Sequence, residues 1–227
     1  MGKNLFIAEK PSVAQEFAKA LKDTFSRNNG FWEGTNNVVT WCVGHLVTMS
    51  YPEIYNPDLK RWRIDTLPFI PKQFLYEIIP SVERQFEIVK SQLTRADIDC
   101  IYVCTDSGRE GEYIYRLVDQ MANVPAEKIR RRVWIDSQTE EEILRGIKEA
   151  KTWDAYDALS DSAYLRAQED YLMGINFSRI LTIKYGNTLK NHLKADKKQI
   201  PMVLYGNNSS KANRTFMQGF LYQLRPY

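Results

Sequence analysis

Acidic side chains follow two short apolar stretches of this chain. Glu9 comes directly after the apolar residues 5–8, and Asp106 and Glu110 follow soon after the apolar residues 101–104. Each stretch has the length of a buried strand, and open α/β sheets bind their ligands at the carboxyl ends of strands. If the two strands are neighbours, these acids form a carboxylate cluster. Such a cluster suits Mg²⁺ and chemistry on phosphodiesters.

The elements that must position these acids alternate between strands and helices. The apolar patterns predict strands over 4–8, 38–43, 100–104 and 130–135, and helices that begin near 11, 82, 109 and 139. Thr139 and Glu142 form a capping box at the start of the last of these helices. Residues 30–37 are rich in turn residues and predict a hairpin. The alternation favours an α/β fold with a mostly parallel sheet that is covered on both faces.

The pattern changes after Trp153, where apolar residues recur at the spacing of one long helix. We therefore predict an α/β domain over 1–153 and part of a helical domain over 154–202. Residues 203–227 predict a divergent or disordered tail. Residues 50–80 are rich in proline and aromatic residues and predict an ordered excursion from the first domain.

The composition limits the class of protein. Hydrophobic residues make up 44% of 227, which is enough for a core, and no run of about 18 apolar residues predicts a membrane span. The N-terminal pattern is not that of a signal peptide. The three cysteines lack metal-ligand spacing, so we expect them to be reduced and buried in a cytoplasmic protein.

The net charge of +3 is unevenly distributed. Seven lysines and arginines follow Asn187, against Asp196 alone. A basic end of this kind contacts nucleic acid in many proteins, but a solvated tail has the same composition. The charge alone therefore does not identify a partner.

Four motifs occur in order along the chain. They are FIAEKPS at 6–12, TWCVGHL at 40–46, TDSGREGE at 105–112 and DYLMGIN at 170–176. Together they resemble the N-terminal part of a type IA DNA topoisomerase of the topoisomerase III kind. The resemblance covers roughly residues 3–190 and stops near Val203.

The resemblance implies a Rossmann-like Toprim domain over 1–153, joined to part of the helical domain that lines a groove for single-stranded DNA. Enzymes of this family relax and decatenate DNA without ATP. A tyrosine breaks one strand and holds its 5′ phosphate, and Mg²⁺ at the Toprim carboxylates assists. The implied partner is single-stranded DNA within duplex or supercoiled DNA. The implied location is the cytoplasm, at the nucleoid.

The resemblance also assigns roles to individual residues. Glu9 would hold metal or pass a proton to the leaving 3′ oxygen, and the ammonium of Lys10 would stabilise phosphate charge. Asp106 and Glu110 match the first and third acids of an Asp-x-Asp-x-Glu metal pattern. Gly108 stands at the second acid, so one expected ligand is missing, although Mg²⁺ accepts a site with one or two carboxylates.

A further set of residues matches positions that line the DNA groove. The candidates for DNA contact are Lys10, His45, Arg109, Arg166 and Asp170, and Arg179 is a secondary candidate. These residues also have ordinary structural explanations. Arg166 and Asp170, for example, are four positions apart on one helix face and would form an intrahelical ion pair. Glu112 equally suits a helix N-terminus, and the Arg130–Arg132 run suits a cluster at a helix C-terminus.

No tyrosine of this chain lies in the family's nucleophile motif, and the expected Gly-Arg-Val segment is absent. We therefore expect a fragment that lacks the C-terminal domains of the same polypeptide and is inactive alone. One alternative is a stand-alone Toprim nuclease or primase-like protein that uses the same acids. Another is a non-catalytic single-strand binder, whose binding would fall with salt.

Overall fold

The computed structural model describes residues 2–185, so the predicted tail over 203–227 lies outside the described residues. The chain forms two compact units. Of the described residues, the first comprises 2–49 and 75–166, and the second comprises 50–74 and 167–185. Within the described residues, no helix is long and apolar enough to cross a membrane.

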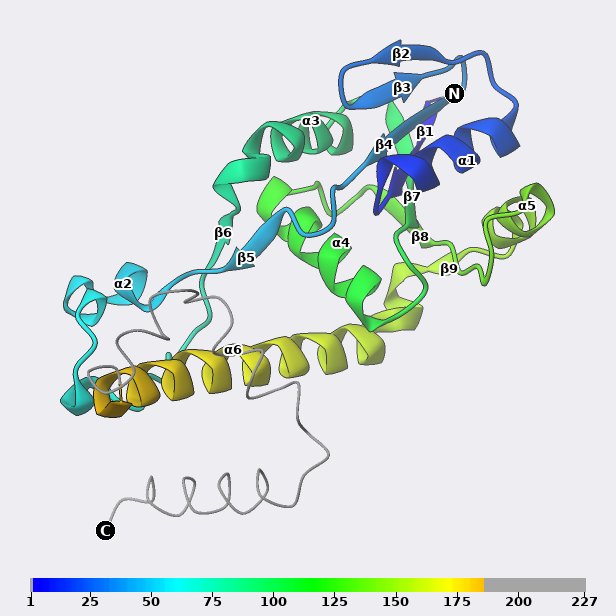
Figure 1. Ribbon diagram of the computed structural model, residues 1–227. Helices are drawn as coiled ribbons and strands as arrows, with labels where there is room; N and C mark the ends of the chain where they lie inside the picture. The colour runs from blue at the N-terminus through cyan, green and yellow to red at the C-terminus, as the bar shows by residue number, and fades with distance from the viewer. Residues whose placement is uncertain (1, 186–227) are drawn as a thin grey trace. The chain divides into compact units, whose positions relative to one another are not determined.

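A seven-stranded sheet forms the centre of the first unit (Figure 1). Its strands are β1 (Lys3–Ala8), β2 (Ser26–Asn28), β3 (Phe31–Glu33), β4 (Asn37–Trp41), β7 (Ile98–Cys104), β8 (Ile129–Arg132) and β9 (Lys151–Thr152). Their order is β2-β3-β4-β1-β7-β8-β9. The four central strands run parallel, and β2, β3 and β9 are antiparallel additions at the edges. The predicted α/β fold with a mostly parallel sheet is confirmed.

Helices cover both faces of this sheet (Figure 1). On one face lie α1 (Pro11–Leu21) and α5 (Glu140–Lys148), and on the other lie α3 (Glu83–Leu93) and α4 (Arg109–Ala122). Phe6, Phe17 and Ile143 join one buried cluster between β1, α1 and α5. Two covered faces explain why β1 and β7 carry apolar runs instead of an alternating pattern.

The local signals for helix ends are mostly confirmed. α1 begins at Pro11. Proline suits this position because an N–H group in the first turn of a helix has no acceptor within the helix. The Thr139 hydroxyl accepts the N–H of Glu142 at 3.4 Å and caps α5. The Glu142 carboxylate accepts instead from the N–H of Asp136, so only half of the predicted capping box forms. The range 30–37 predicted as a hairpin contains the turns of two successive hairpins, one between β2 and β3 at Gly30, with φ of 78°, and one between β3 and β4 over 34–36.

The first unit also contains smaller elements. These are the antiparallel strands β5 (Val47–Met49) and β6 (Tyr76–Ile78), and the 3-10 turns Pro80–Val82 and Trp153–Tyr156. All three cysteines are buried and free, as expected, and burial raises the pKa of Cys42 to about 12. The helix α6 (Asp157–Tyr185) confirms the long helix predicted after Trp153.

In the second unit, α6 orders the stretch that is rich in proline and aromatic residues. The stretch contains α2 (Pro52–Tyr55) and the 3-10 turns Pro57–Lys60 and Ile64–Thr66. The Asn176 side chain accepts the N–H of Phe69 at 2.6 Å and donates to its carbonyl at 2.9 Å. The Tyr171 hydroxyl donates to the carbonyl of Ser50 at 2.6 Å.

These contacts group residues 50–74 with the second half of α6. The domains predicted from the sequence divide the chain differently, because they keep this stretch inside 1–153. The difference arises from Asn176, which lies 107 positions from Phe69 and whose pairing no local pattern indicates.

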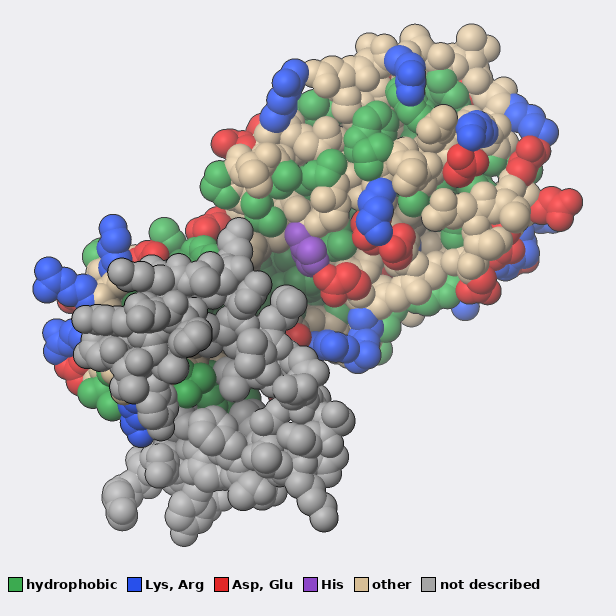
Figure 2. Space-filling model, in the orientation of Figure 1, with side chains coloured by type: hydrophobic (Ala, Val, Ile, Leu, Met, Phe, Trp, Pro, Cys, Tyr) green, Lys and Arg blue, Asp and Glu red, His purple; other side chains and the backbone are tan. Residues whose placement is uncertain are grey.

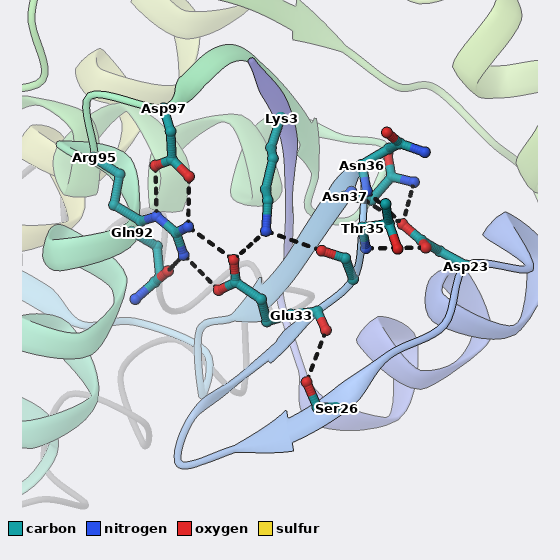
Figure 3. Close-up of polar contacts among 11 residues, drawn as sticks. Lys3, Asp23, Ser26, Glu33, Thr35, Asn36, Asn37, Gln92, Arg95 and Asp97 are labelled. Carbon is teal, nitrogen blue, oxygen red and sulfur yellow. Dashed lines mark hydrogen bonds and ion pairs between the residues drawn. The ribbon is translucent and has the colours of Figure 1, made fainter. Parts of the chain in front are cut away.

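A polar network joins β1, β3 and the segment just before β7 at the end of the sheet where β1 begins (Figure 3). Arg95 donates to both carboxylate oxygens of Glu33, at 2.6 and 2.8 Å, and to Asp97. Lys3 donates to Glu33 from the other side and to the carbonyl of Gly34 at 3.0 Å. Hydrogen bonds from Arg95, helped by Lys3, lower the pKa of Glu33 to about 2.

We expect Glu33→Gln to lower the free energy of unfolding at pH 7 by about 2 kcal/mol, because it removes charge-assisted hydrogen bonds. The folded pKa of Glu33 lies below its usual value of 4.5, so this stability is present above about pH 4.5 and is lost as the pH falls toward 2. Urea unfolding of both proteins at several pH values measures the difference. Glu16→Gln, at an exposed pair with Lys19, is the control. A difference that stays constant down to about pH 3 would contradict the prediction.

Candidate functional site

The acids of the two motifs meet at the carboxyl ends of β1 and β7. Ala8 pairs with Cys104 in parallel register, so the chain leaves both strands side by side. The Glu9 carboxylate accepts the N–H of Asp106 at 3.4 Å. The Lys10 ammonium lies 3.3 Å from Glu9 Oε1 and 3.8 Å from Asp106 Oδ2. The structure thus brings together three of the predicted residues.

These three side chains differ in their exposure to solvent. Glu9 is buried, with a side chain 8% exposed, whereas the side chains of Lys10 and Asp106 are 54% and 55% exposed. Hydrogen bonding and charge from Glu9, and then the charge of Asp106, raise the pKa of Lys10. Two carboxylates therefore share one ammonium at a position open to solvent, which leaves room for a cation or for a phosphate with its own cation.

Glu110 does not join this pair. It lies in the first turn of α4, where Oε1 is 2.5 Å from Nε2 of His45. The His45 ring packs edge-on against Tyr113, with centroids 6.1 Å apart. Figure 2 shows acidic, basic and histidine side chains gathered on this face of the first unit.

Within residues 2–185, no three acidic, histidine or cysteine side chains are grouped as metal ligands. The predicted cluster of Glu9, Asp106 and Glu110 is therefore present as a pair and a separate third acid. Glu110 is paired with His45 instead. The role of each acid as a ligand stays a prediction.

Two glycines of the TDSGREGE motif have different roles. A Cβ atom on Gly111 would lie 2.1 Å from the carbonyl oxygen of Asp106, so the first turn of α4 packs directly on the backbone of that residue. A Cβ atom on Gly108 would meet nothing within 4 Å, and its backbone is extended, with φ of 174°. Only Gly111 is required by the local packing.

A buried ion pair holds the Asp106 segment from beneath. Arg132 is 2% exposed, and its Nε donates to Glu112 at 3.0 Å. Its two other nitrogens donate to the carbonyls of Val103, Thr105, Val133 and Asp106, at 3.1, 2.7, 3.0 and 2.7 Å. The second oxygen of Glu112 accepts from Nε of Arg116 at 2.8 Å.

This ion pair was not foreseen from the sequence. The strand predicted over 130–135 is confirmed in its first residues by β8, whereas the interpretation of Arg130–Arg132 as a cluster at a helix C-terminus is wrong, because these residues belong to that strand. Arg130 pairs with Asp119 on α4 at 2.7 Å. A strand with three consecutive arginines, preceded in the chain by a helix that has an acid on its buried side, is the signal that could have indicated the pairing.

Hydroxyl groups complete the support of the loop. Thr105 donates to the carbonyl of Gly111 at 2.8 Å. Ser107 donates to the carbonyl of Ile135 at 2.8 Å and accepts its N–H at 2.9 Å. Asp106 therefore projects from a segment that is fixed at the residues on both sides of it.

The remaining DNA-contact candidates lie on two helices. Arg109 is exposed at the first residue of α4, and Arg166 and Asp170 are exposed on α6. The spacing on α6 places the last two on one side of the helix, as expected. Their contact with DNA stays a prediction.

The fold and the paired acids define a class of protein. The profile of the family described as "Toprim domain" matches residues 4–137, and the chain belongs to this family. The chain is also 41% identical over 189 residues to DNA topoisomerase 3 of Bacillus subtilis (strain 168), and 43% identical over 184 residues to DNA topoisomerase 3 of Staphylococcus epidermidis. The predicted resemblance to topoisomerase III-type enzymes is confirmed.

The matched regions cover different shares of the proteins. They include 83% and 81% of this chain but 26% and 25% of the two relatives, so the chain spans about a quarter of their length. The solved structure of full-length topoisomerase I from Thermotoga maritima matches with a TM-score of 0.53 and 17% identity. The matched region includes 78% of this chain and 26% of the Thermotoga maritima chain. This structural likeness supports the fold.

We expect Arg132→Leu to lower the free energy of unfolding by about 3–5 kcal/mol, because it leaves Glu112 charged and buried with one partner fewer. Arg131→Leu is the matched control, since Arg131 lies next in the same strand and is exposed. Urea unfolding of the three proteins measures the effect. Equal stability of the two variants would contradict the structural role of the buried pair.

Gly111→Ala should destabilise the protein by about 1–3 kcal/mol or more, because the new methyl group collides with the Asp106 carbonyl. Gly108→Ala should leave the stability within about 0.5 kcal/mol, because nothing lies within reach of its methyl group. Thermal unfolding of both variants compares two glycines of the same motif. The order of the two midpoints is the test, and a reversed order would reject the packing argument.

Proposed function

We propose that this chain is the metal- and single-stranded-DNA-binding part of a type IA DNA topoisomerase of the topoisomerase III kind. One observation carries the proposal. Glu9 and Asp106 meet at the ends of neighbouring parallel strands, with the Lys10 ammonium between them. The relatives named DNA topoisomerase 3 support the choice of reaction.

The donor set of the site suits Mg²⁺. This ion prefers oxygen ligands, keeps several waters and is commonly bound through one or two carboxylates together with substrate phosphate. Glu9 and Asp106 would hold it, and the exposure of Asp106 leaves space for water and phosphate. Glu110 would contribute through water, after release from His45. Bound Mg²⁺ would supply stabilisation of the negative charge on the phosphodiester.

The side chains of the chain itself would do the remaining work. Lys10 carries an ammonium at neutral pH, and the neighbouring Glu9 and Asp106 raise its pKa further. This ammonium would stabilise charge that develops on a phosphate oxygen. Glu9 would hold metal or carry a proton to the leaving 3′ oxygen, from a carboxylate that burial and the Asp106 N–H keep in one position. The backbone contacts of Arg132 would keep Asp106 in register with Glu9.

We assign DNA contact to His45, Arg109, Arg166 and Asp170, and strand cleavage to a tyrosine outside this chain. The chain alone would then bind DNA without relaxing it, and its place in the cell would be the nucleoid. The alternative is a stand-alone Toprim nuclease or primase-like protein. It would use the pair of Glu9 and Asp106 to activate water or a nucleotide hydroxyl.

Asp106→Asn should lower the affinity for Mg²⁺ at least about tenfold, because it removes one of two negative ligands. Calorimetric titration of Mg²⁺ in the presence of a single-stranded oligonucleotide measures this. Asp161→Asn, at an exposed position of α6, is the control. Unchanged affinity in Asp106→Asn would reject the metal site. Mg²⁺-dependent nicking of plasmid by the wild-type chain, lost in the variant, would favour the nuclease over the topoisomerase part.

A further inference from the structure

The charged side chains at the ends of β1 and β7 differ in how firmly they are held. The carbonyl of Glu9 accepts the N–H of Gly44 at 3.2 Å, and the Glu9 carboxylate is buried. Asp106 is exposed at its side chain but fixed at its carbonyl, which accepts from Arg132 at 2.7 Å. Both carboxylates therefore project from backbone that is held in place.

Lys10 combines a fixed backbone with a movable charge. It precedes Pro11, which restricts it to extended backbone, and its φ and ψ are −138° and 154°. Its carbonyl accepts the N–H of Ala14 at 3.1 Å. The side chain makes no capping contact with α1, is 54% exposed, and carries its ammonium on a flexible four-carbon stem. The ammonium is thus free to turn toward another anion without a change in the backbone.

The ammonium of Lys10 now lies against the oxygens that an ion would need. Its nitrogen is 3.3 Å from Oε1 of Glu9 and 3.8 Å from Oδ2 of Asp106. A cation held jointly by these two carboxylates would lie beside this nitrogen or in its place. Like charges at such short distances repel each other, so the ammonium and a metal ion exclude each other from this position.

The composition of the site strengthens this competition. Two carboxylates face one ammonium, which leaves one negative charge uncompensated. Gly108 supplies no further carboxylate, and Glu110 is paired with His45. A divalent ion added beside the ammonium would place three positive charges against two negative ones, so the ion gains its full attraction only after the ammonium leaves.

We propose that Lys10 is a built-in competitor of Mg²⁺, and that a phosphodiester opens the metal site by drawing the Lys10 ammonium away from Glu9 and Asp106. The phosphate offers the ammonium anionic oxygens in exchange for the two carboxylates. Mg²⁺ and nucleic acid then bind cooperatively, and by linkage each raises the affinity for the other by the same factor. This inference rests on the proposed function, because it concerns the same site and the same substrate.

The first test measures the affinity of the full chain for Mg²⁺ alone, by calorimetric titration at constant ionic strength. Lys10→Gln should bind Mg²⁺ about tenfold more tightly than the wild type, because the variant lacks the competing charge. Lys19→Gln is the matched control, since Lys19 lies on the same helix, is 60% exposed and pairs with Glu16 at 2.8 Å. It removes the same charge outside the site and should bind Mg²⁺ as the wild type does. Equal or weaker binding by Lys10→Gln would overturn the inference.

Lys10→Arg distinguishes the charge of the side chain from its shape. This variant keeps a cation beside the two carboxylates, so its affinity for Mg²⁺ alone should stay close to that of the wild type. An affinity as high as that of Lys10→Gln would show that the gain does not come from the lost charge, and the inference would fail.

A second titration adds a saturating dT oligonucleotide. The affinity of the wild type for Mg²⁺ should then rise about tenfold or more, whereas that of Lys10→Gln should rise less, because its carboxylates are already accessible. An equal rise in both proteins would overturn the inference and leave the proposed function intact. If the wild type binds no Mg²⁺ in either titration, the proposed function fails, and the inference fails with it.

Discussion

The buried ion pair between Arg132 and Glu112 is the interaction on which the first unit depends. A charged guanidinium inside a protein requires compensation, and here one carboxylate and four carbonyl oxygens supply it. Those carbonyls belong to the end of β7, to the loop after it and to the chain beyond β8, while Glu112 lies on α4. The pair therefore joins three elements at the point where Asp106 leaves the sheet. The pair mainly fixes the position of the loop. Its net contribution to the free energy of unfolding is small compared with that of apolar residues of similar volume.

The two ends of the sheet carry different kinds of polar structure. Where β1 begins, Glu33 and Arg95 are fully engaged with each other and with Lys3, so that network has no open position for a ligand. Where β1 ends, Glu9 and Asp106 share the single ammonium of Lys10, and Asp106 is open to solvent. A satisfied network stabilises the strands, whereas an incompletely satisfied one can bind. This contrast agrees with the rule that α/β sheets bind ligands at the carboxyl ends of their strands.

Much of this arrangement could be predicted from the sequence. Continuous apolar runs at β1 and β7 indicated buried parallel strands, and the acids that follow them indicated that Glu9 and Asp106 lie close together, because both signals are local. The pairing of Glu110 with His45, 65 positions away, could not be predicted, nor could the pairing of Asn176 with Phe69. These contacts depend on which elements become neighbours in three dimensions. The same limit applies to Arg132 of β8, because its partner Glu112 lies 20 positions earlier in the chain. The sequence neighbours of the arginines predict a helix C-terminus and give no sign of this partner.

The two units have opposite electrostatic deficits. In the first, two carboxylates exceed one ammonium, so the site favours a cation. In the second, two nitrogens of the buried Arg179 guanidinium have no hydrogen-bond partner, so the surroundings of that side chain favour an anion. Neither a metal ion alone nor a neutral ligand would satisfy both units.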